Sequence, residues 1–256
     1  MSGSIVAFVN QKGGVGKTTL AMHLAVHLAG DGRRRRVVVV DCDPQGNATS
    51  WLLDGDLSQA GLFELLVIGK SLGQCVRSSN RWKLGVLPGN GRTAEAMIFL
   101  AATAKPFSFI SEALRPLANI ADYVLLDMPP SRSAGFSEML FACDWVVVPT
   151  QLERLAMEGV GLMADTVTRL SQERGRGPRL LGVVPNMTRW TREHREQMEE
   201  LVKVFGSVVW PPVPLSVRVA EASAYGDVVF DLAPGEKVTT ALHMVAARFV
   251  NAIEAA

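Results

Sequence analysis

The chain has 256 residues, of which 48% are hydrophobic and 20% are charged, a composition that fits one large or two small globular domains. Its formal net charge of +1 is too small for the molecule as a whole to attract a polyanion. Any contact with nucleic acid therefore needs a local patch of basic side chains. Three widely spaced cysteines without a CxxC pair argue against a zinc site or a disulfide framework.

Short apolar runs alternate with helical patterns along the chain. The runs are apolar on both faces, as expected of strands in a parallel sheet that is covered by helices. We predict strands over residues 4–9, 36–41, 123–127, 145–150 and 180–186, with residues 82–89 as a further candidate. Alternation of strands and helices implies right-handed crossovers, and it predicts an α/β fold with a mostly parallel, doubly wound sheet flanked by helices.

Helical patterns occupy the intervening segments. Leu20, Leu24 and Leu28 recur every four residues after the first strand, and further helices are predicted over 153–174 and 106–118. The region 53–120 is the least regular. No repeat or linker divides the chain, so we expect one domain over residues 1–256. No stretch reaches the roughly 18 apolar residues of a membrane span, and a signal peptide is not recognisable, which favours a cytoplasmic protein.

The stretch FVNQKGGVGKTTL, residues 8–20, follows the first strand and begins a helix, which is the context of a phosphate-binding loop. Gly13, Gly14 and Gly16 allow backbone N–H groups to approach a phosphate, and the helix presents its positive end to the anion. We expect Lys17 to reach the β- and γ-phosphates and the Thr18 hydroxyl to bind Mg²⁺. The predicted ATP-binding segment also contains Val15 and Thr19.

This loop departs from the standard phosphate-binding pattern at two positions. Gln11 stands where the first glycine is expected, and Lys12 adds a second lysine. The residues alone leave the role of Lys12 open, because most lysines are solvated surface charges.

Acidic residues follow two other predicted strands. VVVVDCDPQGNATSWL (37–52) contains Asp41 and Asp43, and YVLLDMPPS (123–131) contains Asp127. The ends of parallel strands meet at one edge of a sheet, so these carboxylates should lie near the glycine-rich loop. Asp127 has the Walker B arrangement that holds Mg²⁺. The side chains of Asp41 and Asp43 alternate, which would place one toward the metal and the other toward an attacking water. A helix-capping turn is the alternative for the segment after Asp41.

The glycine-rich loop, the two acidic segments and FACDWVVVPTQLERLAMEG (141–159) resemble motifs of the ParA/MinD family, whose members are P-loop ATPases with a deviant Walker A motif. The motifs also follow one another along the chain in the same order as in that family. The resemblance is nearest to Soj-like ParA proteins without an amino-terminal helix-turn-helix domain. It implies ATP hydrolysis with Mg²⁺ and a homodimer in the ATP state, in which Lys12 reaches the nucleotide of the partner subunit. It also implies catalytic roles for Lys12, Lys17 and Asp43, and a metal shell of Thr18, Asp41 and Asp127.

The nucleotide base has two further candidates. Asn186, in GVVPNMTRW (182–190), ends the last predicted strand and is placed to hydrogen-bond a base edge. Members of the family use an asparagine near this point for adenine, with a proline-containing loop on the other side. Pro214 in VPLSVRVAEASAYG (213–226) corresponds to that loop, although Leu215 and Ser216 replace a common Arg-Asn pair.

Arginines cluster in two places. Arg189, Arg192 and Arg195 lie in one segment and Arg218 in another, and ParA proteins contact DNA nonspecifically near the positions of Arg189 and Arg218. We predict DNA contacts for Arg189, Arg192 and Arg218. The alternative is a solvated helix face, because four glutamates lie among these arginines. A second run, 33–36, is a secondary candidate or a surface turn.

The resemblance implies a ParA-type ATPase that segregates a plasmid or chromosome on the nucleoid with a ParB-like partner. The alternative within the family is a positioning ATPase for a protein cargo, such as a carboxysome or a chemoreceptor cluster, with a cargo adaptor as its partner. A MinD-type membrane regulator is disfavoured, because no basic residue follows Phe249 and the apolar stripe of 238–249 suits core packing. A ligase related to dethiobiotin synthetase is a further alternative, for which no metabolite-pocket signature is present.

Overall fold

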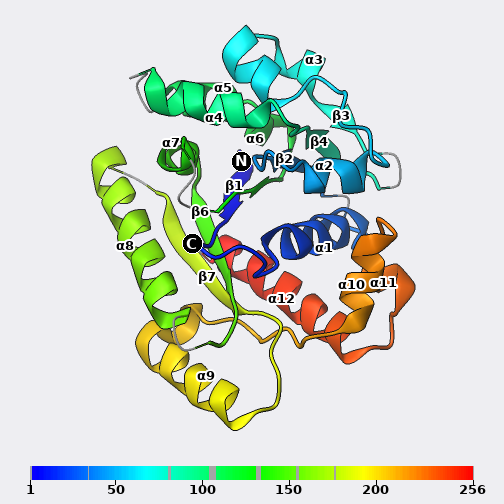
Figure 1. Cartoon of the computed structure of the whole chain (residues 1–256), viewed down its shortest axis with the longest axis vertical. Helices are drawn as coiled ribbons and strands as arrows, with labels where there is room; N and C mark the ends of the chain where they lie inside the picture. Colours follow the sequence, from blue (N-terminus) through cyan, green and yellow to red (C-terminus); the bar gives the residue numbers. More distant parts are fainter. Residues whose placement is uncertain are drawn as a thin grey trace.

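Residues 2–33, 35–79, 82–103, 108–130, 134–153, 156–175 and 177–255 are described by the structure, a computed structural model. Within them, one sheet has the strand order β3-β4-β2-β5-β1-β6-β7 (Figure 1). The strands are β1 (Ser4–Phe8), β2 (Val37–Asp41), β3 (Arg77–Ser78), β4 (Gly85–Leu87), β5 (Tyr123–Asp127), β6 (Trp145–Thr150) and β7 (Arg179–Pro185). Among these described strands only the β3–β4 pair is antiparallel, so the predicted mostly parallel sheet is confirmed.

Helices cover both faces of this sheet, as a doubly wound fold requires. Figure 1 shows α1 and α12 on one side of the sheet and α8 on the other. The first side holds α1 (Lys17–Gly30), α2 (Asn47–Leu52), α10 (Val217–Ala224), α11 (Val229–Leu232) and α12 (Lys237–Glu254). The other side holds the π-helix η1 (Glu64–Ile68), α3 (Leu72–Cys75), α4 (Thr93–Ala102), α5 (Ser108–Leu114), α6 (Leu117–Ile120), α7 (Phe136–Phe141), α8 (Ala156–Arg174), α9 (Arg192–Phe205) and the 3₁₀ turn η2 (Gly206–Val208).

Side-chain alternation along the strands builds a separate core on each face. In β1, Ile5 and Ala7 pack with α4 to α8, whereas Val6 and Phe8 pack with α1 and α12. All four side chains are fully buried. Burial on both faces of the parallel strands therefore explains the continuous apolar runs of the sequence.

The carboxyl-terminal helix α12 belongs to the core, as predicted. Val238, Leu242, Val245 and Phe249 are buried, and the Phe249 ring lies 5.3 Å from the ring of Tyr123 in β5. The helix therefore stabilises the sheet through its apolar stripe. Among the described helices, none has the length and apolar composition needed to cross a bilayer.

The predicted helix over 106–118 is wrong as a single element. Its first two positions lie outside the described residues, and the remainder forms α5 and α6 with a break at Pro116. Proline lacks a backbone donor and disfavours helical geometry in the residue before it, which explains the break. Arg115 at the break pairs with both carboxylate oxygens of Asp144, at 2.9 and 2.7 Å.

Candidate functional site

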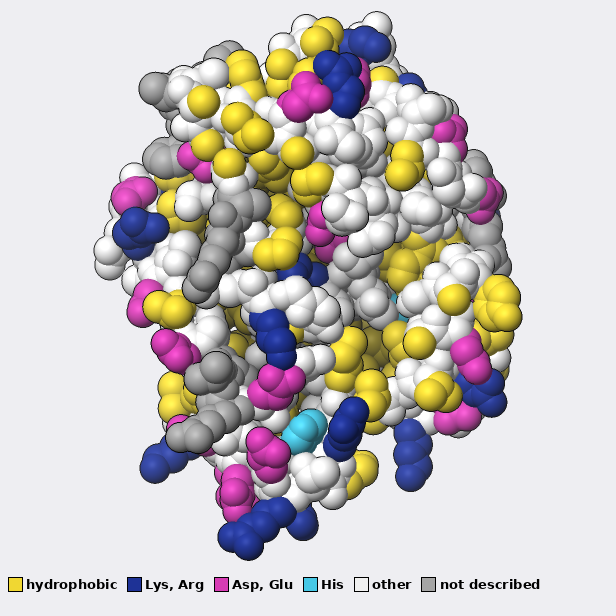
Figure 2. Space-filling model, viewed as in Figure 1, with side chains coloured by type: hydrophobic (Ala, Val, Ile, Leu, Met, Phe, Trp, Pro, Cys, Tyr) yellow, Lys and Arg dark blue, Asp and Glu magenta, His cyan; other side chains and the backbone are white. Residues whose placement is uncertain are grey.

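The predicted site residues converge at the carboxyl edge of the sheet. The register pairs Asp127 of β5 with Phe8 of β1 and with Asp41 of β2, so that the strand ends lie side by side. A cleft of about 760 Å³ opens there, and its lining includes the glycine-rich loop, Thr18 and Asp43. Figure 2 shows this hollow in the middle of the face, with acidic and basic side chains inside it.

The glycine-rich loop has the backbone conformation of an anion cradle. Gly14 and Gly16 have φ values of 74° and 89°, a region that favours glycine, and α1 begins at the next residue, Lys17. A Cβ atom on Gly16 would lie 2.3 Å from Nδ2 of Asn186, so this position is restricted by space as well. A Cβ on Gly13 or Gly14 would meet nothing within 4 Å. The loop therefore leaves room above its backbone for a phosphate.

Lys17 is turned inward over this loop. Its Nζ donates to the carbonyl oxygens of Lys12, at 3.3 Å, and Asn10, at 3.5 Å. The side chain is buried, and burial lowers the pKa of Lys17 while the carboxylates of Asp127 and Asp43 oppose that shift. A buried ammonium facing two acids at a glycine-rich loop is suited to hold a polyphosphate.

Lys12 lies at the rim of the cleft, in contrast to Lys17. Its Nζ is 2.6 Å from Oε2 of Glu153 and 3.2 Å from Oε1 of Gln151, both in the segment after β6. The side chains of Lys12 and Glu153 are each 54% exposed. The two lysines of the loop therefore occupy different environments, one inside the site and one outside it.

Asp127 has an unsatisfied carboxylate at the base of the site. The residue is fully buried, and neither carboxylate oxygen has a hydrogen-bond partner among the described residues. Burial raises the pKa of Asp127 well above its usual range, Asp41 adds to the rise, and Thr18 and Lys17 oppose it. A buried orphan carboxylate beside the Thr18 hydroxyl is a donor set that fits Mg²⁺.

Asp41 is occupied by hydrogen bonds from its own loop. Its Oδ2 accepts from the backbone N and the hydroxyl of Thr49, at 2.8 and 2.7 Å, and its Oδ1 accepts from the backbone N of Asp43, at 3.1 Å. Because Thr49 lies in the first turn of α2, Asp41 satisfies one of the free backbone N–H groups at the start of that helix, whose N-cap residue, Gly46, has no side-chain cap bond. Asp43 is half-buried and lines the cleft.

A second cavity of about 250 Å³ adjoins the phosphate loop. Its lining includes Asn186, Met187, Pro214 and Leu215, so the two predicted base-binding residues lie together. Nδ2 of Asn186 donates to the carbonyl of Val15, at 2.8 Å, which ties the end of β7 to the loop. The largely apolar lining with few polar groups suits a flat heterocycle.

Comparisons with known proteins agree with this geometry. Residues 3–177 match a family model described as an AAA domain. The chain is 38% identical to the chromosome-partitioning ATPase Soj of Thermus thermophilus over 231 residues, which cover 90% of this chain and 88% of that protein. The chain belongs to the ParA/MinD family of ATPases. It is accordingly an ATP hydrolase of the ParA type.

Two solved structures show the same fold. A complex of a Cyanothece McdA variant with ATP superposes with a TM-score of 0.87 at 21% identity, covering 99% of this chain and 97% of that one. A structure described as cobyrinic acid a,c-diamide synthase of Mycobacterium smegmatis, with bound ADP and magnesium, has a TM-score of 0.81 at 27% identity. It covers 98% of this chain and 95% of that chain.

The predicted DNA-contacting arginines of this ParA-type ATPase, Arg189, Arg192 and Arg218, form one group, and the run 33–36 forms another. Thr188 and Pro214 form a parallel bridge, so the segment with Arg189 and Arg192 runs beside the start of α10 with Arg218. Arg192 pairs with Glu196 at 2.7 Å, and Arg218 pairs with Glu221 at 2.8 Å.

In the run 33–36, position 34 lies outside the described residues. Arg35 pairs with Asp31, and Arg36 pairs with Asp122 at 3.1 Å. These pairs favour the interpretation of this run as a surface turn.

Sequence reasoning missed four residues that contact the predicted site. Glu153 and Gln151 hold Lys12, while Thr49 and Gly89 surround Asp41. Thr49 stands inside the quoted DCDPQGNAT segment and Glu153 follows a strand that ends at the same edge. Gly89 ends the candidate strand over 82–89, but nothing in that stretch indicated that it lies against Asp41 and Thr49.

Proposed function

We propose that this protein binds ATP with Mg²⁺ at the cleft, closes into a homodimer around the nucleotide, and segregates a chromosome or plasmid by cycling on and off DNA. The observation that carries the proposal is the division between its two lysines. Lys17 is buried over its own loop, whereas the ammonium of Lys12 is directed to exposed groups at the rim. A cation at the rim is positioned to act on a nucleotide across a dimer interface, as an arginine finger does.

Each residue of the site has a distinct task in this proposal. The loop N–H groups and Lys17 hold the phosphates, and Asp43 orients the attacking water. Thr18 and Asp127 would hold Mg²⁺, which when bound supplies positive charge to the β- and γ-phosphates. Asn186 and Pro214 would contact the base in the adjoining cavity.

DNA binding is proposed for the surface of Arg189, Arg192 and Arg218. All three are exposed, and the bridge between Thr188 and Pro214 brings their segments together. Contacts of this kind reach phosphates and carry no sequence information, so binding would be nonspecific and salt-dependent. A dimer would present the surface twice, and a ParB-like partner would stimulate hydrolysis and release.

Dimerisation and hydrolysis of a Lys12→Ala variant test the proposal directly. ATP-dependent dimerisation, measured by light scattering, and ATPase activity should both be lost, whereas the exposed Lys70→Ala control should retain them. Unchanged dimerisation and hydrolysis in Lys12→Ala would contradict the cross-dimer role. Failure of ATP-loaded wild-type protein to retain random-sequence DNA at low salt would contradict the DNA-based function.

The same preparation separates the other functions considered. Turnover of ATP without any small-molecule acceptor distinguishes an ATPase cycle from a ligase. Stimulation of that turnover by a ParB-like protein, rather than by a cargo adaptor, distinguishes DNA segregation from positioning of a protein cargo.

A further inference from the structure

The hydroxyl of Thr49 joins two loops at the edge of the active site. It donates to Oδ2 of Asp41, at 2.7 Å, and accepts from the backbone N of Gly89, at 2.7 Å. Thr49 and Asp41 are both fully buried. A single hydroxyl therefore connects the loop after β2, which carries Asp43, with the loop after β4.

These two loops are in close contact along their backbones. A Cβ atom on Gly89 would lie 2.6 Å from the carbonyl oxygen of Asp41, and one on Gly46 would lie 3.0 Å from the carbonyl oxygen of Gly89. Such distances leave no space for a side chain at Gly89 without movement of the backbone. The position of the loop after β2 is therefore set in part by the loop after β4.

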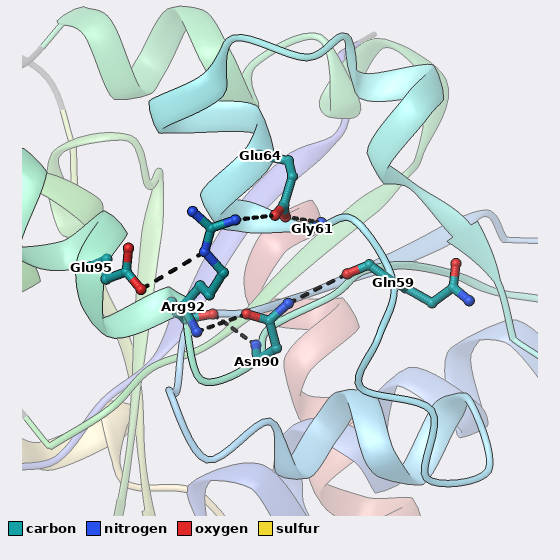
Figure 3. Close-up of polar contacts among 7 residues, drawn as sticks. Gln59, Gly61, Glu64, Asn90, Arg92 and Glu95 are labelled. Carbon is teal, nitrogen blue, oxygen red and sulfur yellow. Dashed lines mark hydrogen bonds and ion pairs between the residues drawn. The ribbon is translucent and has the colours of Figure 1, made fainter.

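The loop after β4 is itself held from its other side (Figure 3). Nδ2 of Asn90 donates to the carbonyl of Gln59, at 3.4 Å. The guanidinium of Arg92 lies between Glu64, at 3.5 Å, and Glu95, at 3.8 Å. It also stacks on the ring of Phe63, 3.6 Å from the centroid. These contacts make the loop a fixed support rather than a free segment.

We propose that Thr49 is a positioning residue for ATP hydrolysis, which acts through Asp41 on Asp43. Asp41 accepts from the backbone N of Asp43 with one oxygen and from Thr49 with the other. Thr49 thereby fixes the carboxylate that fixes the backbone of Asp43. This assigns Asp41 the task of an internal anchor in the loop, and it rests on the proposed role of Asp43 in orienting water.

The expected effect concerns the chemical step and not ATP binding. A displacement of about 1 Å in a group that orients a reactant lowers the rate by about 100-fold. Thr49→Val keeps the shape and the backbone bond to Asp41 but removes both hydroxyl bonds. We therefore expect kcat to fall at least about 10-fold with the KM for ATP unchanged, because the hydrogen bonds of this hydroxyl in the described residues go to Asp41 and Gly89 and not to the phosphate loop.

The experiment compares four variants in steady-state ATPase assays, at a temperature well below the unfolding transition of each. Asp43→Asn defines the loss of the water-orienting acid. Thr49→Val should lower kcat and leave both KM and the Mg²⁺ concentration for half-activation unchanged, and Thr49→Ser, which retains a hydroxyl, should restore kcat. Thr168→Val, which removes an exposed hydroxyl bond within α8, is the matched control. If Thr49→Val does not fold, Thr49→Ala replaces it.

The outcomes separate the inference from the proposed function. If Asp43→Asn is inactive while Thr49→Val retains wild-type kcat, the positioning role is wrong and the function of Asp43 stands. If Asp43→Asn retains wild-type kcat, the role of Asp43 is wrong and the basis of the inference is lost. A Thr49→Val variant that raises KM or the Mg²⁺ requirement without lowering kcat would show that Thr49 serves binding instead.

Discussion

The ammonium of Lys12 lies 2.6 Å from the carboxylate of Glu153 within the same chain. The lysine that would act across a dimer is thus held by an acid of its own subunit, and Gln151 adds a second contact at 3.2 Å. Gln151 also donates to the sulfur of Met187, which lines both the cleft and the second cavity, so Lys12 is connected through Gln151 to the lining of both.

Removal of this acid should make Lys12 more available. We expect Glu153→Gln to tighten ATP-dependent dimerisation by up to about fivefold, because an exposed ion pair contributes at most about 1 kcal/mol. Sedimentation velocity with ATP measures the effect, and Glu158→Gln in α8 is the matched control. Weaker dimerisation in Glu153→Gln would show that the acid belongs to the dimer interface.

Charge reversal on the arginine surface should weaken DNA binding without affecting the ATPase cycle. Arg189→Glu and Arg218→Glu should each reduce retention of random-sequence DNA and lower the slope of affinity against salt by about one. Fluorescence anisotropy at several salt concentrations measures both quantities. Arg169→Glu, on α8 away from this surface, is the control. If Arg218→Glu also abolishes dimerisation, Arg218 is not a dedicated phosphate contact.

Acid should destabilise the protein through His23. This buried side chain accepts from the backbone N of Val229 and contacts the carbonyl of Thr19, and burial lowers the pKa of His23 from 6.5 to about 4. The unfolded chain binds the proton first as pH falls below 6.5, so stability is present above that pH and is lost as pH falls toward about 4.

The expected loss from His23 is about 2 kcal/mol between about pH 7.5 and about pH 5. Urea unfolding at the two pH values gives the total change in the free energy of unfolding. The difference between this change in the wild-type protein and in His23→Asn isolates the contribution of His23. The raised pKa of buried acids such as Asp127 makes the folded state more stable as pH falls, which is opposite to the effect of His23. The comparison with His23→Asn is therefore needed. An equal pH dependence in the variant would contradict the assignment.

Phe249 tests whether α12 serves the core or a membrane. The ring is fully buried and lies 6.3 Å from the ring of Trp210. Phe249→Ala should lower the free energy of unfolding by about 3–5 kcal/mol, as expected for loss of a buried phenylalanine. Thermal and urea denaturation measure it, with Met244→Ala, on the exposed side of the same helix, as the control. An effect on liposome binding without an effect on stability would favour a membrane role.

The sequence allowed most of the sheet to be predicted because the parallel strands are largely buried on both faces and therefore appear as continuous apolar runs, whereas the two-residue strand β3 (Arg77–Ser78) is not buried and has no such run. It also placed Lys17, Asp43 and Asp127 together, since the carboxyl ends of parallel strands share one edge. The glycine-rich loop is local in sequence, so its conformation followed from its own residues.

Contacts between distant segments were not predictable in the same way. Glu153 is separated from Lys12 by 141 positions, and Gly89 from Thr49 by 40. Neither pair has a local pattern, because each depends on how β4 and β6 are ordered in the sheet. The short strand β4 also explains why residues 53–120 appeared irregular.

The close approach of the loops after β2 and β4 has a consequence for sequence variation in this least regular region. Alanine at Gly61 would place its Cβ 2.0 Å from the carbonyl oxygen of Pro88, and alanine at Gly89 would collide with Asp41. At Gly73 and Gly91 the added atom would meet nothing within 4 Å. A saturation library screened for stable protein should therefore recover only glycine at 61 and 89, and many residue types at 73 and 91. Functional variants of this ATPase can therefore change the surface between α2 and α4 at positions such as 73 and 91, while Gly61 and Gly89 beneath it stay fixed.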